Sequence, residues 1–157
     1  YLSWKAREYG FHTSMIEASM MINDRMPEYC VERASRMLNS VRKPMNGSRV
    51  LVLGVAYKQD IDDYRESPAI KVIRHLEERG AEVVFYDPFV LEYKHEGQIR
   101  RSAEALTKEL IESADLVIVT TGHTVVDYAF VQRHAKLIFD TKNAMKDICD
   151  RSNIEVL

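Results

Sequence analysis

The sequence predicts an α/β fold in which a parallel sheet is flanked by helices and preceded by one long helix. Short, nearly uninterrupted apolar runs such as Val50 to Val55 recur along the chain, and such runs are typical of strands covered on both faces. Segments with helical periodicity alternate with these runs, which indicates βαβ units with right-handed crossovers. A third observation is the apolar stripe at helical spacing within residues 1–43, which predicts the long helix.

The composition is that of a globular protein without a marked charge bias. The chain has 157 residues, of which 46% are hydrophobic and 29% are charged, and its net charge is −2. That charge gives no electrostatic reason to expect nucleic acid or an anionic membrane as a partner, and no apolar run approaches the ~18 residues of a membrane span. Cys30 and Cys149 lie far apart and outside metal-type spacing, so we expect two reduced thiols, no metal site and a cytoplasmic location.

The first 45 residues are predicted to form a helical region. Its apolar stripe consists of Met15, Ala18, Ile22, Met26, Cys30, Ala34, Met37, Leu38 and Val41. The helix is expected to start at Thr13 or Ser14. Because Pro27 removes a backbone hydrogen bond and clashes with the preceding turn, at a cost of about 3 kcal/mol, we expect a kink near residues 23–27 or two abutting helices. The stripe must pack on the following domain, on sequence outside this chain or on a second copy, and these alternatives stay open.

The turn cluster at residues 44–48 marks the boundary between the helical region (residues 1–45) and an α/β domain (residues 46–157). Apolar runs predict strands at 49–55, 81–86, 116–120, 137–140 and 154–157. Helical patterns predict helices at 68–79, capped by Ser67 and closed by Gly80, at 102–113, capped by Ser102, and at 125–134. Residues 89–101 are polar and irregular, so we expect a loop there.

The segment between the first strand and its helix is the best candidate for a functional loop. Gly54 stands at the carboxyl end of the strand, where a missing Cβ permits close approach. Open α/β sheets bind phosphorylated ligands where a strand end leads into a helix N-terminus, and Lys58 and Arg65 place two cations there. The dinucleotide fingerprint Gly-x-Gly-x-x-Gly is absent from this loop, so binding would use Lys58 and the ring of Tyr57.

Three acids in the same loop, Asp60, Asp62 and Asp63, have two interpretations. They could hold a metal ion, or they could pair with the neighbouring cations and face water. The second interpretation is favoured because Mg²⁺ sites usually recruit substrate phosphates as well.

Other polar segments follow strand ends at Asp87, at residues 120–123 and at residues 140–143, and all should meet at one edge of a parallel sheet. Lys142 is the cation there that we expect to reach a ligand. His123 is interpreted as a structural hydrogen-bonding residue, because nothing near it in the sequence looks like a nucleophile. The chain therefore indicates a binding site without catalytic residues.

Several motifs, in order, resemble the UDP-glucose/GDP-mannose dehydrogenase family. Residues 53–68, Leu-Gly-Val-Ala-Tyr-Lys-Gln-Asp-Ile-Asp-Asp-Tyr-Arg-Glu-Ser-Pro, resemble the signature that opens the C-terminal domain of that family. Related motifs fall at residues 85–88, 120–123 and 139–144, and residues 1–6 and 22–27 resemble its central helical region. The resemblance covers essentially the whole chain and is closest to bacterial enzymes that oxidise UDP-N-acetylhexosamines.

The resemblance implies a fragment of an NAD-dependent enzyme that oxidises the C6 alcohol of a UDP-sugar to a carboxylate through a cysteine thiohemiacetal. It implies that Tyr57 and Lys58 contact the nucleotide sugar, with Lys58 on the diphosphate. Arg65 would reach toward NAD⁺. Lys142 stands where many members have Arg, so it would offer a point charge instead of a bidentate fork.

In that family the catalytic cysteine, the catalytic lysine and the NAD⁺ domain lie upstream of the segment that matches Tyr1. The resemblance therefore implies that this chain is cut from a longer enzyme, is inactive alone and forms a homodimer through its long helix. Two alternatives remain, a stand-alone nucleotide-binding module and a dimerisation unit whose cleft is vestigial.

Overall fold

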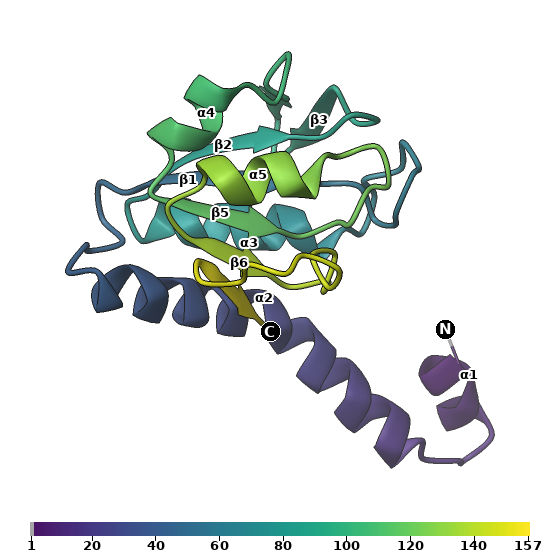
Figure 1. Ribbon diagram of the computed structural model, residues 1–157. Coiled ribbons are helices and arrows are strands. Elements are labelled where there is room, and N and C mark those ends of the chain that lie inside the picture. Colours follow the sequence, from purple (N-terminus) through teal and green to yellow (C-terminus); the bar gives the residue numbers. More distant parts are fainter. Residues whose placement is uncertain (1) are drawn as a thin grey trace.

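The computed structural model describes residues 2–157, so Tyr1, the first residue of the motif at residues 1–6, lies outside the described residues. Two helices precede an α/β domain (Figure 1). The helices of the described chain are α1 (Leu2–Glu8), α2 (Ser14–Ser40), α3 (Pro68–Glu78), α4 (Lys108–Ser113) and α5 (Tyr128–His134). The strands are β1 (Arg49–Leu53), β2 (Glu82–Tyr86), β3 (Glu92–His95), β4 (Gln98–Arg101), β5 (Leu116–Val119), β6 (Ile138–Asp140) and β7 (Ile154–Val156).

Five strands form one parallel sheet in the order β2-β1-β5-β6-β7, so the predicted parallel α/β fold is confirmed. The crossovers from β1 to β2, from β2 to β5 and from β5 to β6 each contain a helix, α3, α4 and α5 respectively. From β1 the chain moves outward to β2 and then returns past β1 to β5. The direction of winding therefore reverses between β1 and β5, and open α/β sheets bind ligands at such a reversal.

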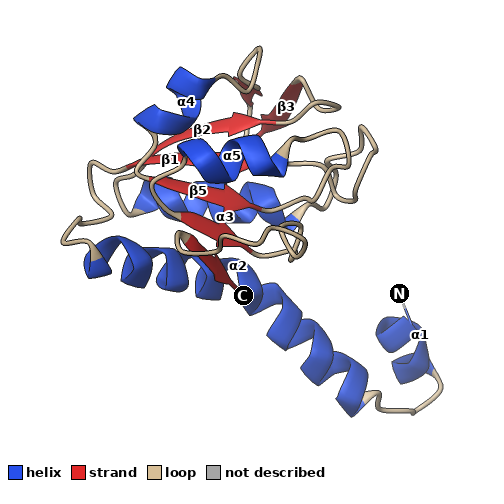
Figure 2. Ribbon diagram, viewed as in Figure 1, coloured by secondary structure: helices blue, strands red, loops and turns tan. Residues whose placement is uncertain are grey.

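Helices cover both faces of the sheet (Figure 2). Val50 and Val52 of β1 belong to a core with α2 and α3, whereas Leu51 and Leu53 face a second core with α4 and α5. Because successive side chains of a strand point to opposite faces, both sets must be apolar, which explains the uninterrupted runs seen in the sequence.

Two expectations for residues 89–113 are wrong. Residues 89–101 contain the antiparallel hairpin of β3 and β4, which turns through Glu96 (φ 48°) and Gly97 (φ 81°). Ser102 caps no helix, because its hydroxyl accepts a hydrogen bond from the N–H of Asp87 at 3.0 Å. Helix α4 starts later, where the hydroxyl of Thr107 accepts from the N–H of Leu110 at 3.2 Å. The hairpin strands are largely charged because they pair only with each other, outside the main sheet.

The third predicted helix also starts later than expected. Helix α5 begins at Tyr128, because the carboxylate of Asp127 accepts a hydrogen bond from the N–H of Phe130 at 2.8 Å and caps that turn. The remaining strand and helix limits differ from the predicted ones by one or two residues at their ends.

Helix α2 contains Pro27 and changes direction part-way along its length, in agreement with the expected kink (Figure 1). Its C-terminal half packs on the α/β domain and buries Cys30, Val31, Ala34, Met37 and Leu38. Its N-terminal half projects away from the domain, and Met15, Met20 and Ile22 are 86%, 54% and 65% exposed. The stripe is therefore core at one end and uncovered by the described residues at the other. Within the described chain no helix is long and apolar enough to cross a membrane.

Candidate nucleotide-binding site

A cavity of about 1040 Å³ opens at the carboxyl edge of the sheet, where the winding reverses. The loops after β1, β5 and β6 surround it. Residues that line it include Tyr57, Lys58, Thr121, His123, Lys142 and Lys146. The candidate loop after β1 and the polar segments at residues 120–123 and 140–143 are thus brought together, as expected.

The loops after β1 and β5 touch at Gly54. This residue has φ 97°, and a Cβ built on it would lie 2.5 Å from Cβ of Thr121 and 2.8 Å from its backbone nitrogen. The hydroxyl of Thr121 donates to the carbonyl of Ala56 at 2.7 Å, and that of Thr120 donates to the carbonyl of Leu53 at 3.1 Å. The glycine therefore permits backbone contact between two loops.

Asp87, at the end of β2, is fully buried and fixes the start of the first loop. Its Oδ2 accepts hydrogen bonds from the N–H groups of Val55 and Ala56 at 2.8 and 2.9 Å, and its Oδ1 accepts from Phe89 and Val90, both at 2.9 Å. Burial opposes ionisation, but the bonds from His123 and from these backbone groups outweigh it and hold the pKa of Asp87 well below its usual range. Asp87 is therefore a carboxylate that organises backbone.

His123 connects this buried carboxylate to the far side of the same loop. Its Nε2 lies 3.2 Å from Oδ2 of Asp87, and its Nδ1 accepts a hydrogen bond from the N–H of Asp60 at 3.0 Å. A ring nitrogen that accepts a hydrogen bond carries no proton, so the proton lies on Nε2, which donates to Asp87. The interpretation of His123 as a structural hydrogen-bonding residue agrees with this geometry.

A second buried carboxylate, Asp140 at the end of β6, shapes the third loop. Its Oδ1 accepts from the N–H groups of Lys142 and Ala144 at 3.0 and 3.1 Å, and its Oδ2 accepts from Met145 at 2.8 Å. Asn143 adopts φ 52° within this turn. The turn presents Lys142 to the cavity and brings in Lys146, which lies beyond the polar segment predicted at residues 140–143 and was not among the predicted site residues.

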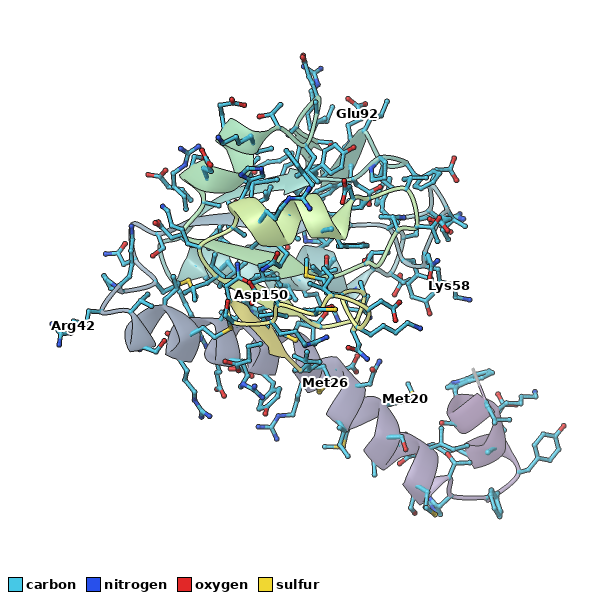
Figure 3. The ribbon with its side chains drawn as sticks, viewed as in Figure 1. Met20, Met26, Arg42, Lys58, Glu92 and Asp150 are labelled. Carbon is cyan, nitrogen blue, oxygen red and sulfur yellow. The ribbon has the colours of Figure 1, made fainter. Side chains whose placement is uncertain are left out.

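Lys58, Lys142 and Lys146 line the cavity, and within residues 2–157 none of them lies within ion-pair distance of a carboxylate. The Lys58 ammonium is 5.5 Å from the ring centroid of Tyr57, which is itself 49% exposed. Figure 3 shows Lys58 extending from the domain on the side of these loops. Unpaired cations beside an exposed aromatic ring suit a ligand that carries phosphate and a planar base.

A second cavity of about 430 Å³ adjoins the first, and Tyr57, Lys58 and Lys142 line both. Its other wall is the bend of α2, with Pro27 and Cys30. Burial raises the pKa of the Cys30 thiol, more than the charges of Lys142 and Arg33 lower it, so this thiol is not activated. Lys58 and Lys142 therefore stand between two parts of one cleft.

Arg65 lines neither cavity. Its guanidinium forms a two-pronged ion pair with Asp63, with Nε–Oδ1 and Nη2–Oδ2 distances of 2.9 Å, and these bonds lower the pKa of Asp63 to about 2. Asp63 thus pairs with a neighbouring cation, in agreement with the second of the two interpretations of the acids in this loop. Asp60 is bound by Thr124 instead. Among residues 2–157 no group of three or more His, Cys, Asp or Glu side chains is arranged to hold a metal ion.

Comparison with known proteins identifies the family of this chain. The family model described as "UDP-glucose/GDP-mannose dehydrogenase family, UDP binding domain" matches residues 51–147. The chain belongs to the UDP-glucose/GDP-mannose dehydrogenase family. The matched segment begins in β1 and ends just beyond the loop after β6, so it includes every residue named above as lining the first cavity.

Individual members of the UDP-glucose/GDP-mannose dehydrogenase family match over most of this chain. A UDP-N-acetyl-D-mannosamine dehydrogenase from Methanococcus maripaludis is 29% identical over 91% of this chain and 33% of its own length. A UDP-glucose 6-dehydrogenase from Haloferax volcanii is 35% identical over 86% of this chain and 31% of its own length. The solved structure of a UDP-N-acetylmannosamine dehydrogenase from Pyrococcus horikoshii has a TM-score of 0.79 at 25% identity and covers 96% of this chain and 35% of that one.

The chain therefore spans about a third of the length of the curated relatives it matches, 33% and 31% for the two named here. Relatives named for UDP-glucose and for UDP-N-acetylmannosamine match at similar identity. The comparisons support a nucleotide-sugar dehydrogenase and select no particular sugar.

Proposed function

We propose that this chain is the substrate-nucleotide-binding part of an NAD-dependent UDP-sugar 6-dehydrogenase, and that the cleft at the sheet edge holds UDP. The observation that carries the proposal is the convergence of Lys58, Lys142 and Lys146, unpaired within the described residues, on the crevice where the winding of the sheet reverses. The family model for a UDP-binding domain spans the same residues.

In this proposal Lys58 and Lys142 neutralise the diphosphate, and the ring of Tyr57 packs against the nucleotide sugar. A lysine at position 142 offers a point charge, whereas an arginine would form two parallel hydrogen bonds to a phosphate. Lys142→Arg is therefore expected to bind UDP more tightly than the wild type.

NAD⁺ is the cofactor we propose for the whole enzyme, and the described residues 2–157 do not form a dinucleotide site. Gly54 contacts Thr121, so it offers no cradle to a pyrophosphate. Arg65, whose side chain is 82% exposed, is the residue that we propose reaches toward NAD⁺. We propose that this chain alone is inactive, and NADH formation on incubation with NAD⁺ and UDP-sugars would contradict that.

The free state of Cys30 and Cys149 supports a reducing compartment, and we propose the cytoplasm.

Removal of the Lys58 ammonium should weaken UDP binding. In Lys58→Ala we expect the dissociation constant for UDP, measured by titration calorimetry, to rise about 10- to 100-fold, because charge-assisted hydrogen bonds contribute about 1.5–3 kcal/mol each. Lys94→Ala is the matched control, since it removes the same charge from an exposed position outside the cleft. Equal UDP affinity in Lys58→Ala and wild type would contradict the proposed site, and no heat from the wild type would favour a dimerisation unit with a vestigial cleft.

We also propose that residues 1–45 form a dimerisation region that pairs with a second copy of the chain. The support is the exposed apolar face of the N-terminal half of α2, which carries Met20 and projects away from the α/β domain (Figure 3).

Ile22→Glu should shift this chain toward monomer. We expect the dimer dissociation constant from sedimentation to rise about 10-fold or more, because a carboxylate would be buried without a partner. Leu91→Glu, at a site 71% exposed and outside residues 1–45, is the control and should leave the mass unchanged. A dimer of undiminished stability in Ile22→Glu would place the interface elsewhere.

A further inference from the structure

The loop that carries Tyr57 and Lys58 is fastened on both sides. On its near side the N–H groups of Val55 and Ala56 bind the buried carboxylate of Asp87. On its far side the N–H of Asp60 donates to Nδ1 of His123, whose opposite nitrogen contacts the same carboxylate. The two cleft residues thus lie on a short span between fixed points.

Asp60 adds side-chain bonds to this far side. Its Oδ1 accepts from the N–H of Thr124 at 2.9 Å, and its Oδ2 accepts from the hydroxyl of Thr124 at 2.8 Å. The backbone N–H of Thr124 is the main reason that the pKa of Asp60 is lowered. Through these contacts Asp60 joins the loop after β1 to the loop after β5, across a separation of 64 residues.

The backbone of Asp60 has a left-handed conformation. Its φ is 59°, in the left-handed region that L-residues other than Asn and Asp rarely adopt. Such a conformation persists where surrounding contacts determine it, and the bonds to His123 and Thr124 are those contacts here.

The negative charge of Asp60 restricts the role that this residue can have beside the proposed diphosphate site. A carboxylate beside an anion site repels the anion, so charge alone gives no reason for an acid at position 60. Among residues 2–157 Asp60 also forms no ion pair with Lys58, and Nδ1 of His123, which lies 3.7 Å from Oδ1 of Asp60, carries no proton because it accepts a hydrogen bond. The acid must therefore act through the backbone that it holds.

We propose that Asp60 is a positioning residue for the diphosphate: it pins the loop of residues 57–60 to Thr124 and His123 so that the ammonium of Lys58 faces the cleft. The inference rests on the proposed function and adds a role to a residue that contacts no ligand. It also gives the loop after β5 a part in binding, since that loop supplies Thr124 and His123.

The test is Asp60→Gly in the full chain, because glycine accepts the positive φ and loses only the side-chain bonds. We expect UDP to bind about 10-fold more weakly, although a negative charge has been removed from beside an anion site. Asp62→Gly is the matched control, since it removes an equal charge from the same loop at a position with no bond to Thr124, and its UDP affinity should be unchanged or slightly higher. Asp60→Asn keeps an acceptor for Thr124 and should retain the wild-type affinity.

A double-mutant cycle separates positioning from general loosening of the fold. Lys58→Ala should weaken UDP binding in the wild type and have a much smaller effect in the Asp60→Gly background, because Lys58 no longer faces the ligand there. An undiminished effect of Lys58→Ala in that background, or tighter UDP binding in Asp60→Gly, would overturn the proposal while leaving the proposed function intact.

A readout without ligand keeps the inference testable if UDP does not bind and the proposed function fails. Amide hydrogen exchange of residues 57–60 should be faster in Asp60→Gly than in Asp62→Gly, at equal exchange of the sheet. Equal exchange of that segment in both variants would contradict the role of Asp60 in fixing the loop.

Discussion

Replacing Asp87 by Asn should lower the free energy of unfolding by about 3–5 kcal/mol at neutral pH, the loss typical when a buried charged network loses one partner. The Asp87 carboxylate accepts hydrogen bonds from backbone groups on two loops and from His123, and it is fully buried. An amide at this position cannot accept all of these bonds, and its own NH₂ group would face other donors.

The same substitution should flatten the acid dependence of stability. The pKa of Asp87 is lower in the folded chain than the ~3.9 of an unfolded aspartate, so its contribution is present above that value and is lost as the pH falls toward the folded pKa. The wild type should therefore lose stability below about pH 5, and Asp87→Asn should show a shallower slope in the same window.

Urea unfolding between neutral and acid pH measures both effects. Asp63→Asn is the comparison variant, because Asp63 also has a lowered pKa but forms an exposed pair with Arg65, and surface pairs contribute little. The role of Asp87 as a buried anchor would be contradicted if the pH dependence of stability in Asp87→Asn were as steep as in the wild type. An equal loss of unfolding free energy in Asp63→Asn would contradict it as well.

The second large effect is expected at Gly54. Gly54→Ala should destabilise the chain by about 3 kcal/mol, because a left-handed residue with a Cβ costs about 1–2 kcal/mol and a forced backbone shift costs about 1–3 kcal/mol. The shift is forced because the new Cβ would meet the backbone nitrogen of Thr121 at 2.8 Å. Since the loops after β1 and β5 would move apart, UDP binding should weaken as well.

Gly47→Ala is the matched control for Gly54→Ala. Gly47 has a similar φ of 77°, but a Cβ there meets nothing within 4 Å. Gly47→Ala should lower the free energy of unfolding only by the cost of a left-handed residue with a Cβ, about 1–2 kcal/mol, and should leave the UDP affinity unchanged. Equal losses of unfolding free energy in the two variants would show that the close contact between Gly54 and Thr121 does not contribute to the loss in Gly54→Ala.

The type of most elements could be read from the sequence. Apolar runs without alternation predicted strands buried on both faces, and Ser67 before Pro68 predicted the start of α3, where the Ser67 hydroxyl accepts from the N–H of Ala69. Because the carboxyl ends of parallel strands share one edge, the sequence also predicted that Lys58 and Lys142 would meet. The local pattern failed at residues 89–101, where two charged strands pair only with each other.

Only the tertiary structure decided which contacts hold the cleft together. Both halves of the α2 stripe have the same spacing, yet just the C-terminal half is buried, because the rest of the domain lies beside that half alone. The bonds from Asp60 to His123 and to Thr124 join residues 63 and 64 positions apart. Periodicity and capping record the local environment of each residue, whereas such pairs are created by the return of the chain across the sheet, which no local pattern encodes.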